Sequence, residues 1–158
     1  MKIGFICSSG GHLTQALGTI EAFRGQDVFL VVHNFPSLKE IRLEQVSRIY
    51  RLRIVFGYSS WVAVCLTMFL NLFQFLRSFW IEKPAILFST GAEIAVPAFY
   101  IGKIIFGTKL IFLESLARVK DFSLTGKLVY PIADLFLVQW PELLDKKRLK
   151  AVYRGRLI

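Results

Sequence analysis

Residues 3–12 read IGFICSSGGH, and this stretch decides the fold. The apolar run over residues 3–7 ends in two serines and two glycines, a pattern typical of a buried strand followed by a tight turn. Over residues 12–23 the apolar side chains recur at helical spacing, and three of them share one face: Leu13, Leu17 and Ile20. The start of the chain therefore predicts a strand, a glycine-rich turn and a helix.

The rest of the chain continues the alternation of strand and helix. Further strands are predicted over residues 28–32, 47–54, 85–88, 109–113 and 135–138, helices over 59–81, 94–106 and 124–132, and a weak helix or loop over 36–44. The strand at 47–54 is more polar and is expected nearer an edge. Because continuous apolar strands separated by helices are typical of parallel sheets covered on both faces, we predict an open, Rossmann-like α/β fold. The sequence has no linker, repeat or break in composition, so residues 1–158 are expected to form one domain.

The chain is unusually apolar for its size. Hydrophobic residues make up 54% of its 158 residues and aromatic residues 15%, whereas charged residues make up only 20%. This composition excludes a disordered chain, and it is more apolar than a small interior can bury, so some apolar surface is expected to face lipid or a partner. The net charge of +9 suits nucleic acid or an anionic membrane, and the apolar content favours the membrane.

The helix predicted over residues 59–81 is apolar almost all round. Within residues 61–76 only three residues are polar, and with Ser78 they form one narrow stripe: Thr67, Asn71 and Gln74. Packing on the sheet explains one face of such a helix but not the opposite face. Three interpretations are open: a core or partner-facing helix, a membrane-spanning helix, and a helix that lies in the membrane surface.

We favour a monotopic helix that lies in the membrane surface. Sixteen residues extend about 24 Å, short of a hydrocarbon core of about 30 Å, and spanning would divide the sheet between the two sides of the bilayer. The residues expected at the membrane are Trp61, Leu66, Phe69, Leu70, Phe73, Leu76, Arg77 and Trp80. The apolar run at residues 3–7 is too short for a signal peptide, so the cytoplasmic face of the cell membrane is expected.

Three loops are expected to carry chemistry, because the site of an open α/β sheet lies beyond the carboxyl ends of its strands. In the first loop, Gly10 and Gly11 allow a ligand to approach closely, and the helix N-terminus offers free N–H groups to an anion. His12 could act there as a neutral general base, or it could only cap the helix or the turn. Glu93 and Glu114 each follow an apolar strand, and each could accept a hydrogen bond from a sugar or cap a helix.

Several motifs are absent from the sequence. GxGxxG does not follow the first strand, and the Gly126-Lys127 pair lacks the leading glycine of a P-loop because residue 121 is Asp. No paired Cys and His spacing indicates a metal site, and Cys7 and Cys65 show no disulfide pattern. The sequence therefore predicts neither a metal nor a cofactor.

Taken together, the loops resemble those of a known family. The turn SSGGH (residues 8–12) resembles the glycine-rich loop of the MurG-type lipid-linked glycosyltransferases, and residues 83–97 resemble the strand and loop that come next in them. More specific is the ordered set LESLARV (113–119), SLTGKL (123–128), AD (133–134) and VQW (138–140). It is similar to asparagine-linked glycosylation protein fourteen and its bacterial relatives of the PssD kind, and the resemblance covers nearly the whole chain.

The resemblance implies one half of a split GT-B glycosyltransferase, equivalent to the N-terminal half of a one-chain GT-B enzyme. Such a chain is the acceptor-side subunit and membrane anchor, while a separate small catalytic subunit binds the nucleotide sugar. The eukaryotic relative has an N-terminal membrane helix that this sequence lacks, so residues 59–81 are expected to provide the anchor. The tail, about residues 150–158, is expected to dock the catalytic subunit, and the docking residues would be Trp140, Tyr153, Arg154, Gly155, Leu157 and Ile158.

The implied reaction transfers a sugar from a UDP-sugar to a polyprenyl-diphosphate-linked acceptor, in capsule, exopolysaccharide or lipid-linked oligosaccharide synthesis. His12 and Glu114 are the candidate catalytic residues, and the chain alone is expected to be inactive. The candidate contacts to the acceptor and its diphosphate are Ser9, Gly10, Gly11, Gly91, Glu93 and Arg118. One alternative is a non-catalytic membrane scaffold that only recruits and activates the catalytic subunit. A stand-alone nucleotide-binding protein would lack its GxGxxG, and a nucleic-acid-binding module would not explain the apolar helix.

Overall fold

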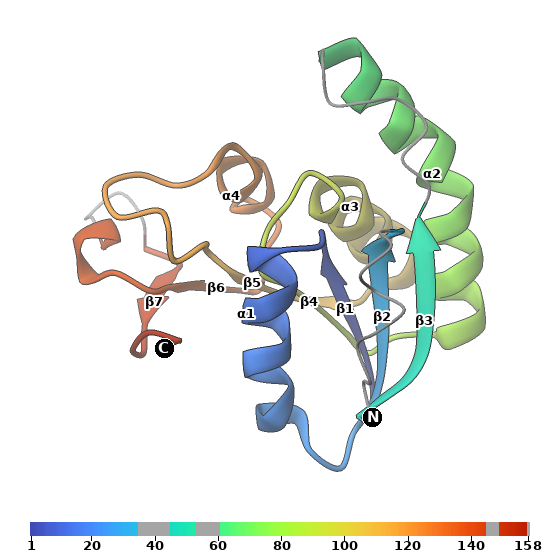
Figure 1. The fold of residues 1–158 in the computed structure, drawn as a ribbon, viewed down its shortest axis with the longest axis horizontal. Helices are drawn as coiled ribbons and strands as arrows, with labels where there is room; N and C mark the ends of the chain where they lie inside the picture. The colour runs from blue at the N-terminus through green and yellow to red at the C-terminus, as the bar shows by residue number, and fades with distance from the viewer. Residues whose placement is uncertain (35–44, 53–60, 145–148, 158) are drawn as a thin grey trace.

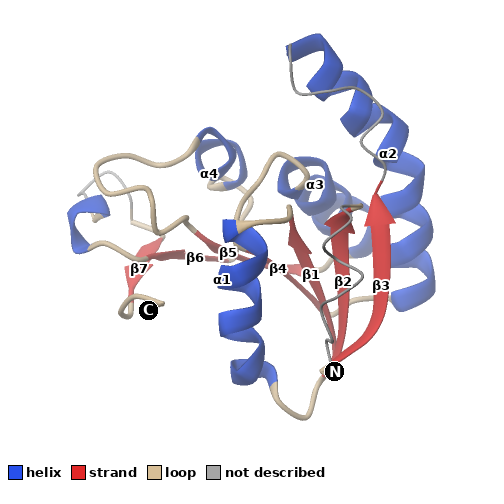
Figure 2. Ribbon diagram, in the orientation of Figure 1, coloured by secondary structure: helices blue, strands red, loops and turns tan. Residues whose placement is uncertain are grey.

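In the residues that it describes, the computed structural model shows a parallel sheet of seven strands with helices on both faces (Figures 1 and 2). The structure describes residues 1–34, 45–52, 61–144 and 149–157. The strands are β1 (Lys2–Cys7), β2 (Asp27–His33), β3 (Val46–Leu52), β4 (Ile86–Ser89), β5 (Lys109–Leu113), β6 (Leu135–Val138) and β7 (Ala151–Tyr153). They lie in the order β3-β2-β1-β4-β5-β6-β7. The predicted Rossmann-like α/β fold is confirmed, and β3 lies at an edge as expected.

The direction in which the sheet grows reverses between β1 and β4. Phe5 in β1 pairs with Leu30 of β2 on one side and with Phe88 of β4 on the other. Strands β2 and β3 thus lie on one side of β1, and β4 to β7 follow on its other side. Because all the strands point the same way, the loops that follow them gather at one end of the sheet, which we call the carboxyl edge. The opposite end is the amino edge.

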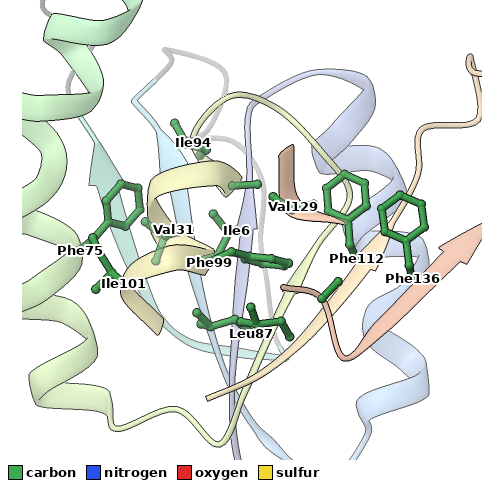
Figure 3. Packing of buried hydrophobic residues seen from close by; sticks show 14 of the residues in the cluster. Ile6, Val31, Phe75, Leu87, Ile94, Phe99, Ile101, Phe112, Val129 and Phe136 are labelled. Atoms are coloured by element: carbon green, nitrogen blue, oxygen red, sulfur yellow. The ribbon is translucent and has the colours of Figure 1, made fainter. Parts of the chain in front are cut away.

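Helices cover both faces of the sheet. Helix α1 (Gly11–Ile20) and the short 3-10 helix η1 (Glu21–Phe23) lie on one face, while α2 (Trp61–Glu82), α3 (Ala95–Phe106) and α4 (Leu124–Val129) lie on the other (Figure 1). A 3-10 turn, η3 (Pro141–Leu143), follows β6. The larger core lies on the α3 side, where Phe99, Phe112 and Phe136 pack together and the rings of the last two stack at 5.1 Å (Figure 3).

The predicted elements differ from the observed ones near the end of the chain. The helix predicted over residues 124–132 ends at Val129, because Pro131 cannot donate a helical hydrogen bond. The three-residue strand β7 was not predicted, and it extends the sheet by pairing Val138 with Tyr153. The weak helix or loop at 36–44, the ends of two predicted elements at 53–54 and 59–60, and Ile158 lie outside the described residues.

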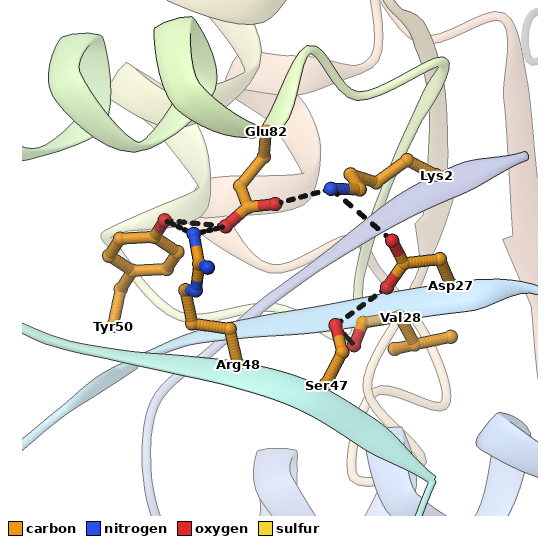
Figure 4. Close-up of polar contacts among 7 residues, drawn as sticks. All are labelled: Lys2, Asp27, Val28, Ser47, Arg48, Tyr50 and Glu82. Carbon is orange, nitrogen blue, oxygen red and sulfur yellow. Dashed lines mark hydrogen bonds and ion pairs between the residues drawn. The ribbon is translucent and has the colours of Figure 1, made fainter.

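Charged side chains close the amino edge around Glu82, the last residue of α2 (Figure 4). Its carboxylate accepts hydrogen bonds from Lys2 and Arg48 at 2.8 Å and from the Tyr50 hydroxyl at 2.5 Å. Burial raises the pKa of Glu82, but the hydrogen bonds from Lys2 and Tyr50 and the nearby positive charges outweigh burial and hold the pKa below its usual value. The same lysine lies 3.2 Å from Asp27, so this network ties the end of α2 to three strands.

Candidate functional site

The carboxyl edge is open around the start of α1. Gly10 precedes the helix with a φ of 77°, and a Cβ placed on Gly10 or Gly11 would meet no atom within 4 Å. Because Gly10 has no side chain, it cannot cap the first turn, and the N–H groups there favour an anion. A groove of about 500 Å³ runs beside this turn, lined by Gly11, His12, Gln15, Ser115, Leu116 and Ala117.

The loop after β4 fixes the orientation of His12. Its Nδ1 lies 2.8 Å from the carbonyl oxygen of Thr90, and the Thr90 hydroxyl donates to the carbonyl oxygen of His12 at 2.7 Å. A carbonyl oxygen can only accept, so Nδ1 carries a proton and, in the neutral ring, the lone pair lies on Nε2. His12 is thus positioned to act as a base through Nε2. The same bonds also hold two loops together, which is the alternative role.

Gly91 lies beneath the His12 ring. Its φ is +117°, and a Cβ added to it would stand 2.7 Å from Cε1 of His12. Only glycine therefore fits at this position. Gly91 is buried and packs against the His12 ring. Its predicted contact with an acceptor stays a prediction.

Glu93 lies in the same loop and reaches a buried histidine. Its carboxylate is 3.5 Å from Nδ1 of His33, the last residue of β2, and the Glu93 side chain is 29% exposed. Burial lowers the pKa of His33, and the negative charge of Glu93 raises it only in part, so the pKa stays below its usual value. Glu93 thus remains accessible enough to accept a hydrogen bond from a sugar hydroxyl.

Glu114 is fully buried and organises the loop between β5 and α4. Its carboxylate accepts from the backbone N–H groups of Ser115 and Ser123 at 2.9 and 3.0 Å, and from the Ser123 hydroxyl at 3.2 Å. Ser123 caps α4 by accepting from the N–H of Gly126, where any Cβ would overlap the Glu114 carboxylate. The sequence left two roles open for Glu114: accepting a hydrogen bond from a sugar, or capping a helix. This geometry favours a role at the helix cap, because Glu114 holds the capping residue Ser123. A catalytic role for Glu114 stays a prediction.

Of the remaining predicted acceptor contacts Gly11 lines the groove, and the others are close in the chain to lining residues. Ser9 and the two glycines lie at the open start of α1, where Ser9 is half-buried. Arg118 is exposed on the loop that forms the opposite wall, and its backbone N–H donates to the carbonyl oxygen of Ser115 at 2.9 Å. The carboxyl edge therefore places an oriented imidazole in the lining of the groove, and Arg118 is an exposed cation next in the chain to Ala117, another lining residue.

Helix α2 turns its polar stripe inward. Thr67, Asn71 and Ser78 are buried, and the Asn71 amide donates to the carbonyl oxygen of Thr67 at 2.9 Å. The outward face carries large exposed apolar side chains: Trp61, Val62, Leu66, Phe69, Leu70, Phe73, Trp80 and Ile81. This is the reverse of an ordinary surface helix, which exposes its polar face.

The first turns of α2 project beyond the carboxyl edge of the sheet (Figure 1). Exposed Arg77 shares the outward face, whereas Leu76, which was also expected at the membrane, is half-buried and packs against the core. In the described part of the chain, no helix has the length and apolar character needed to cross a membrane.

The tail folds back against the sheet after β7. The N–H of Leu157 donates to the Gln139 side chain at 3.0 Å, and the Arg156 guanidinium lies 3.7 Å from the centre of the Trp140 ring. Among the predicted docking residues Arg154 and Gly155 are exposed, whereas Tyr153 is half-buried in β7. An apolar cavity of about 310 Å³ lies under the tail on the α1 face, and its lining includes Phe23, Phe88, Leu137, Arg154 and Leu157.

Residues 3–157 match the model of a protein family described as "Oligosaccharide biosynthesis protein Alg14 like". The chain belongs to the Alg14 family. Two relatives are each named UDP-N-acetylglucosamine transferase subunit. The Mus musculus protein is 28% identical over 186 residues, which cover 100% of this chain and 83% of that protein. The Schizosaccharomyces pombe protein is 30% identical over 169 residues, which cover 93% of this chain and 79% of that protein.

Solved structures share the fold of this Alg14-family chain. MurG from Acinetobacter baumannii superimposes with a TM-score of 0.76 at 16% identity, over 97% of this chain and 45% of MurG. The UDP-GlcNAc 2-epimerase from Methanocaldococcus jannaschii gives a TM-score of 0.72 at 14% identity, over 99% and 46% of the two chains. This chain thus spans less than half the length of either protein. At these identities the likeness concerns the fold alone.

Three polar residues near the site of the Alg14-family chain were not among the predicted site residues: Gln15, His33 and Gln139, the last of which lies in the VQW motif. His33 and Gln139 are buried and each stands at the end of an apolar strand, which is the signal that could have identified them. Gln15 lies one helical turn after His12, so it shares the groove-facing side of α1.

Proposed function

We propose that this chain is the acceptor-binding, membrane-associating subunit of a two-component glycosyltransferase. The reaction would move N-acetylglucosamine from UDP-N-acetylglucosamine to a polyprenyl-diphosphate-linked acceptor, in lipid-linked oligosaccharide, capsule or exopolysaccharide synthesis. Membership of the Alg14 family and the word "subunit" in the names of its relatives support this proposal. A separate catalytic subunit would supply the donor site, and the chain alone would be inactive.

The orientation of His12 beside an open groove carries the proposal. The acceptor diphosphate would bind at the start of α1, with the N–H groups beyond Gly10 and the Arg118 guanidinium as its partners. Nε2 of His12 would take the proton from the acceptor hydroxyl as its oxygen forms a bond to the anomeric carbon of the donor sugar. The bond between that carbon and the diphosphate oxygen of the donor UDP-sugar would break, and UDP would leave.

The exposed face of α2 supports a peripheral or monotopic position on the cytoplasmic face of the cell membrane. Among the side chains of this helix that the structure describes, eight large apolar ones are exposed, which is unusual for a helix that faces water. The first turns of α2 lie at the same end of the sheet as the start of α1 (Figure 1), where Gly11 and His12 line the candidate groove. A membrane at that end would bring the diphosphate of a lipid-linked acceptor within reach of the groove.

The tail and the cavity beneath it would dock the catalytic subunit. The cavity is apolar and has Arg154 and Arg156 at its border, so an apolar segment with acidic neighbours would fit it. Removal of residues 154–158 is expected to abolish co-purification of the catalytic subunit, while the sheet remains folded. A complex that survives this deletion would reject the docking role of the tail.

Substitution of His12 by Asn tests the reaction. The Asn amide nitrogen can take the place of Nδ1 and still donate to the carbonyl oxygen of Thr90, but Asn has no atom at Nε2. We expect transfer by the complex to fall by about 10²–10⁴-fold, with complex formation unchanged. A His12→Ala variant, which also removes the bond to Thr90, should be no more active.

The same pair of variants tests the alternative of a non-catalytic scaffold. In a scaffold, His12 would be needed only for its hydrogen bond to the Thr90 carbonyl oxygen, which holds the start of α1 against the loop after β4. His12→Asn would then retain full turnover while His12→Ala lost part of it, and this outcome would remove His12 from the reaction.

A further inference from the structure

The two residues that follow β6 lie between the groove and the tail. Gln139 is 1% exposed, and its amide makes three hydrogen bonds. Its Nε2 donates to Oε1 of Gln15 at 2.7 Å and to the carbonyl oxygen of Glu114 at 2.9 Å. Its Oε1 accepts the N–H of Leu157 at 3.0 Å. One side chain thus joins α1, the loop after β5 and the tail.

Trp140 makes a second connection between the same parts. Its Nε1 donates to the carbonyl oxygen of Leu116 at 2.6 Å, and the Arg156 guanidinium lies 3.7 Å from the centre of its ring. Leu116 belongs to the loop after β5, and Arg156 belongs to the tail. The second connection is therefore independent of the Gln139 amide.

On the groove side, both connections end at residues that line the groove. Gln15 and Leu116 are two of those lining residues, and the N–H of Leu116 also donates to Oε1 of Gln15 at 3.3 Å. On the tail side they end at Arg156 and Leu157, which line the apolar cavity. Gln139 itself borders that cavity.

We propose that Gln139 and Trp140 are positioning residues that couple docking of the catalytic subunit to binding of the acceptor. This inference rests on the proposed function. A buried amide that loses one partner costs free energy, so the tail and the groove wall are most stable when both are ordered. A partner that orders the tail would therefore preform the groove. Because coupling between two binding sites is reciprocal, the acceptor would tighten binding of the partner by the same factor.

The test uses the complex with the catalytic subunit and, as acceptor probe, a short-chain prenyl diphosphate that carries one N-acetylglucosamine. The Kd of the catalytic subunit is measured with and without saturating probe, together with kcat and the KM for the probe. For the unsubstituted chain we expect the probe to tighten binding of the subunit about tenfold. In Gln139→Met, which keeps the length of the side chain but none of its hydrogen bonds, the factor should fall below about twofold. The KM should rise about tenfold, and kcat should change less than about threefold.

Trp140→Phe is the second variant, in case Gln139→Met does not fold. It keeps an aromatic ring for Arg156 and removes only the bond to Leu116. We therefore expect the factor by which the probe tightens binding of the subunit to fall to about half of its unsubstituted value. Gln26→Met is the control, because Gln26 is an exposed glutamine in the turn before β2. It should leave Kd, KM and kcat unchanged.

The outcomes separate this inference from the proposed function. Full coupling in both Gln139→Met and Trp140→Phe would overturn the inference, as would an unsubstituted complex that transfers sugar but shows no coupling. An unsubstituted complex that transfers no sugar to the probe would reject the proposed function, and the inference with it.

Discussion

The two ends of the sheet differ in the bonding partners of several of their polar side chains. At the amino edge, Glu82 and Asp134 form ion pairs with lysine and arginine side chains that close this end. At the carboxyl edge, His12, Glu114 and Trp140 bond instead to backbone atoms of neighbouring loops. Ion pairs stabilise the fold at one end, whereas side-chain bonds to backbone at the other fix loop positions and leave a groove open.

Helix α2 joins these two ends. Its last residue, Glu82, is held in the amino-edge network, and its first turns extend past the carboxyl edge with apolar side chains exposed. The comparison therefore predicts that amino-edge substitutions change stability and not transfer. Substitutions on the exposed face of α2 should change membrane binding and not stability.

The largest expected effect comes from Glu114, the buried acid of the carboxyl edge. Glu114→Ala leaves two backbone N–H groups and a hydroxyl without their acceptor, and we expect a loss of about 3 kcal/mol in the free energy of unfolding. Glu114→Gln, which keeps one accepting oxygen, should lose about 1–2 kcal/mol. Urea unfolding measures both. A stable Gln variant that has lost transfer more than about 100-fold would instead support the catalytic role.

The exposed face of α2 gives the next effect. Phe69→Ser combined with Phe73→Ser removes two rings that are 62% and 71% exposed, and each should contribute about 1.5 kcal/mol or more when buried in lipid. We expect binding to vesicles that contain anionic lipid to weaken about 100-fold, with unchanged urea unfolding. Leu149→Ser is the matched control, because Leu149 is 89% exposed next to β7. Equal binding by the double variant and the control would remove α2 from the membrane.

Apart from the short strand β7, local patterns in the sequence predict the strands and the glycine turn well. The run at residues 3–7 is apolar because β1 is central and covered on both faces, and this is visible in the letters alone. The sequence also indicated the outward face of α2, because the residues expected at the membrane are not part of the polar stripe and, apart from Leu76, they are exposed. The sequence alone did not show that the polar stripe of Thr67, Asn71 and Ser78 is the buried side, since an ordinary surface helix buries its apolar face.

The contacts of the candidate site depend on pairing between distant parts of the chain. His12 and Thr90 are 78 positions apart, and Gln15 and Gln139 are 124 apart. The glycine loop marks where a ligand could bind, but strand order and register decide which side chains meet there. The sequence therefore identified His12 as a candidate but not its partner, and it marked Gln139 only as part of the VQW motif, without its contacts to Gln15 and the tail.

Glu82 tests the amino edge. Glu82→Gln removes the charge that Lys2 and Arg48 share, and we expect a loss of about 1–2 kcal/mol at pH 7 without loss of transfer. Because the folded protein holds the pKa of Glu82 below its usual 4.5, the contribution of this charge is present above that value. It is lost as the pH falls through the lower, folded pKa.

Urea unfolding at pH 7 and again near pH 3 checks this sign, since the gap between Glu82→Gln and the unsubstituted chain should narrow in acid. A gap that widens in acid would contradict the assigned direction of the pKa shift.

The smallest effect is expected for Lys103 and Asp134, a partly exposed ion pair of the amino edge. Lys103 Nζ lies 2.7 Å from Asp134, and both side chains are about one-third exposed. Such a pair is screened by solvent, so Lys103→Met should cost less than about 1 kcal/mol, and 1 M NaCl should remove most of that difference. The Asp134 carboxylate also accepts the N–H of Leu110 at 2.8 Å, so it keeps a backbone partner when the lysine is gone. Urea unfolding with and without salt measures the cost, and a loss above about 2 kcal/mol would mean that exposed pairs also hold this edge together.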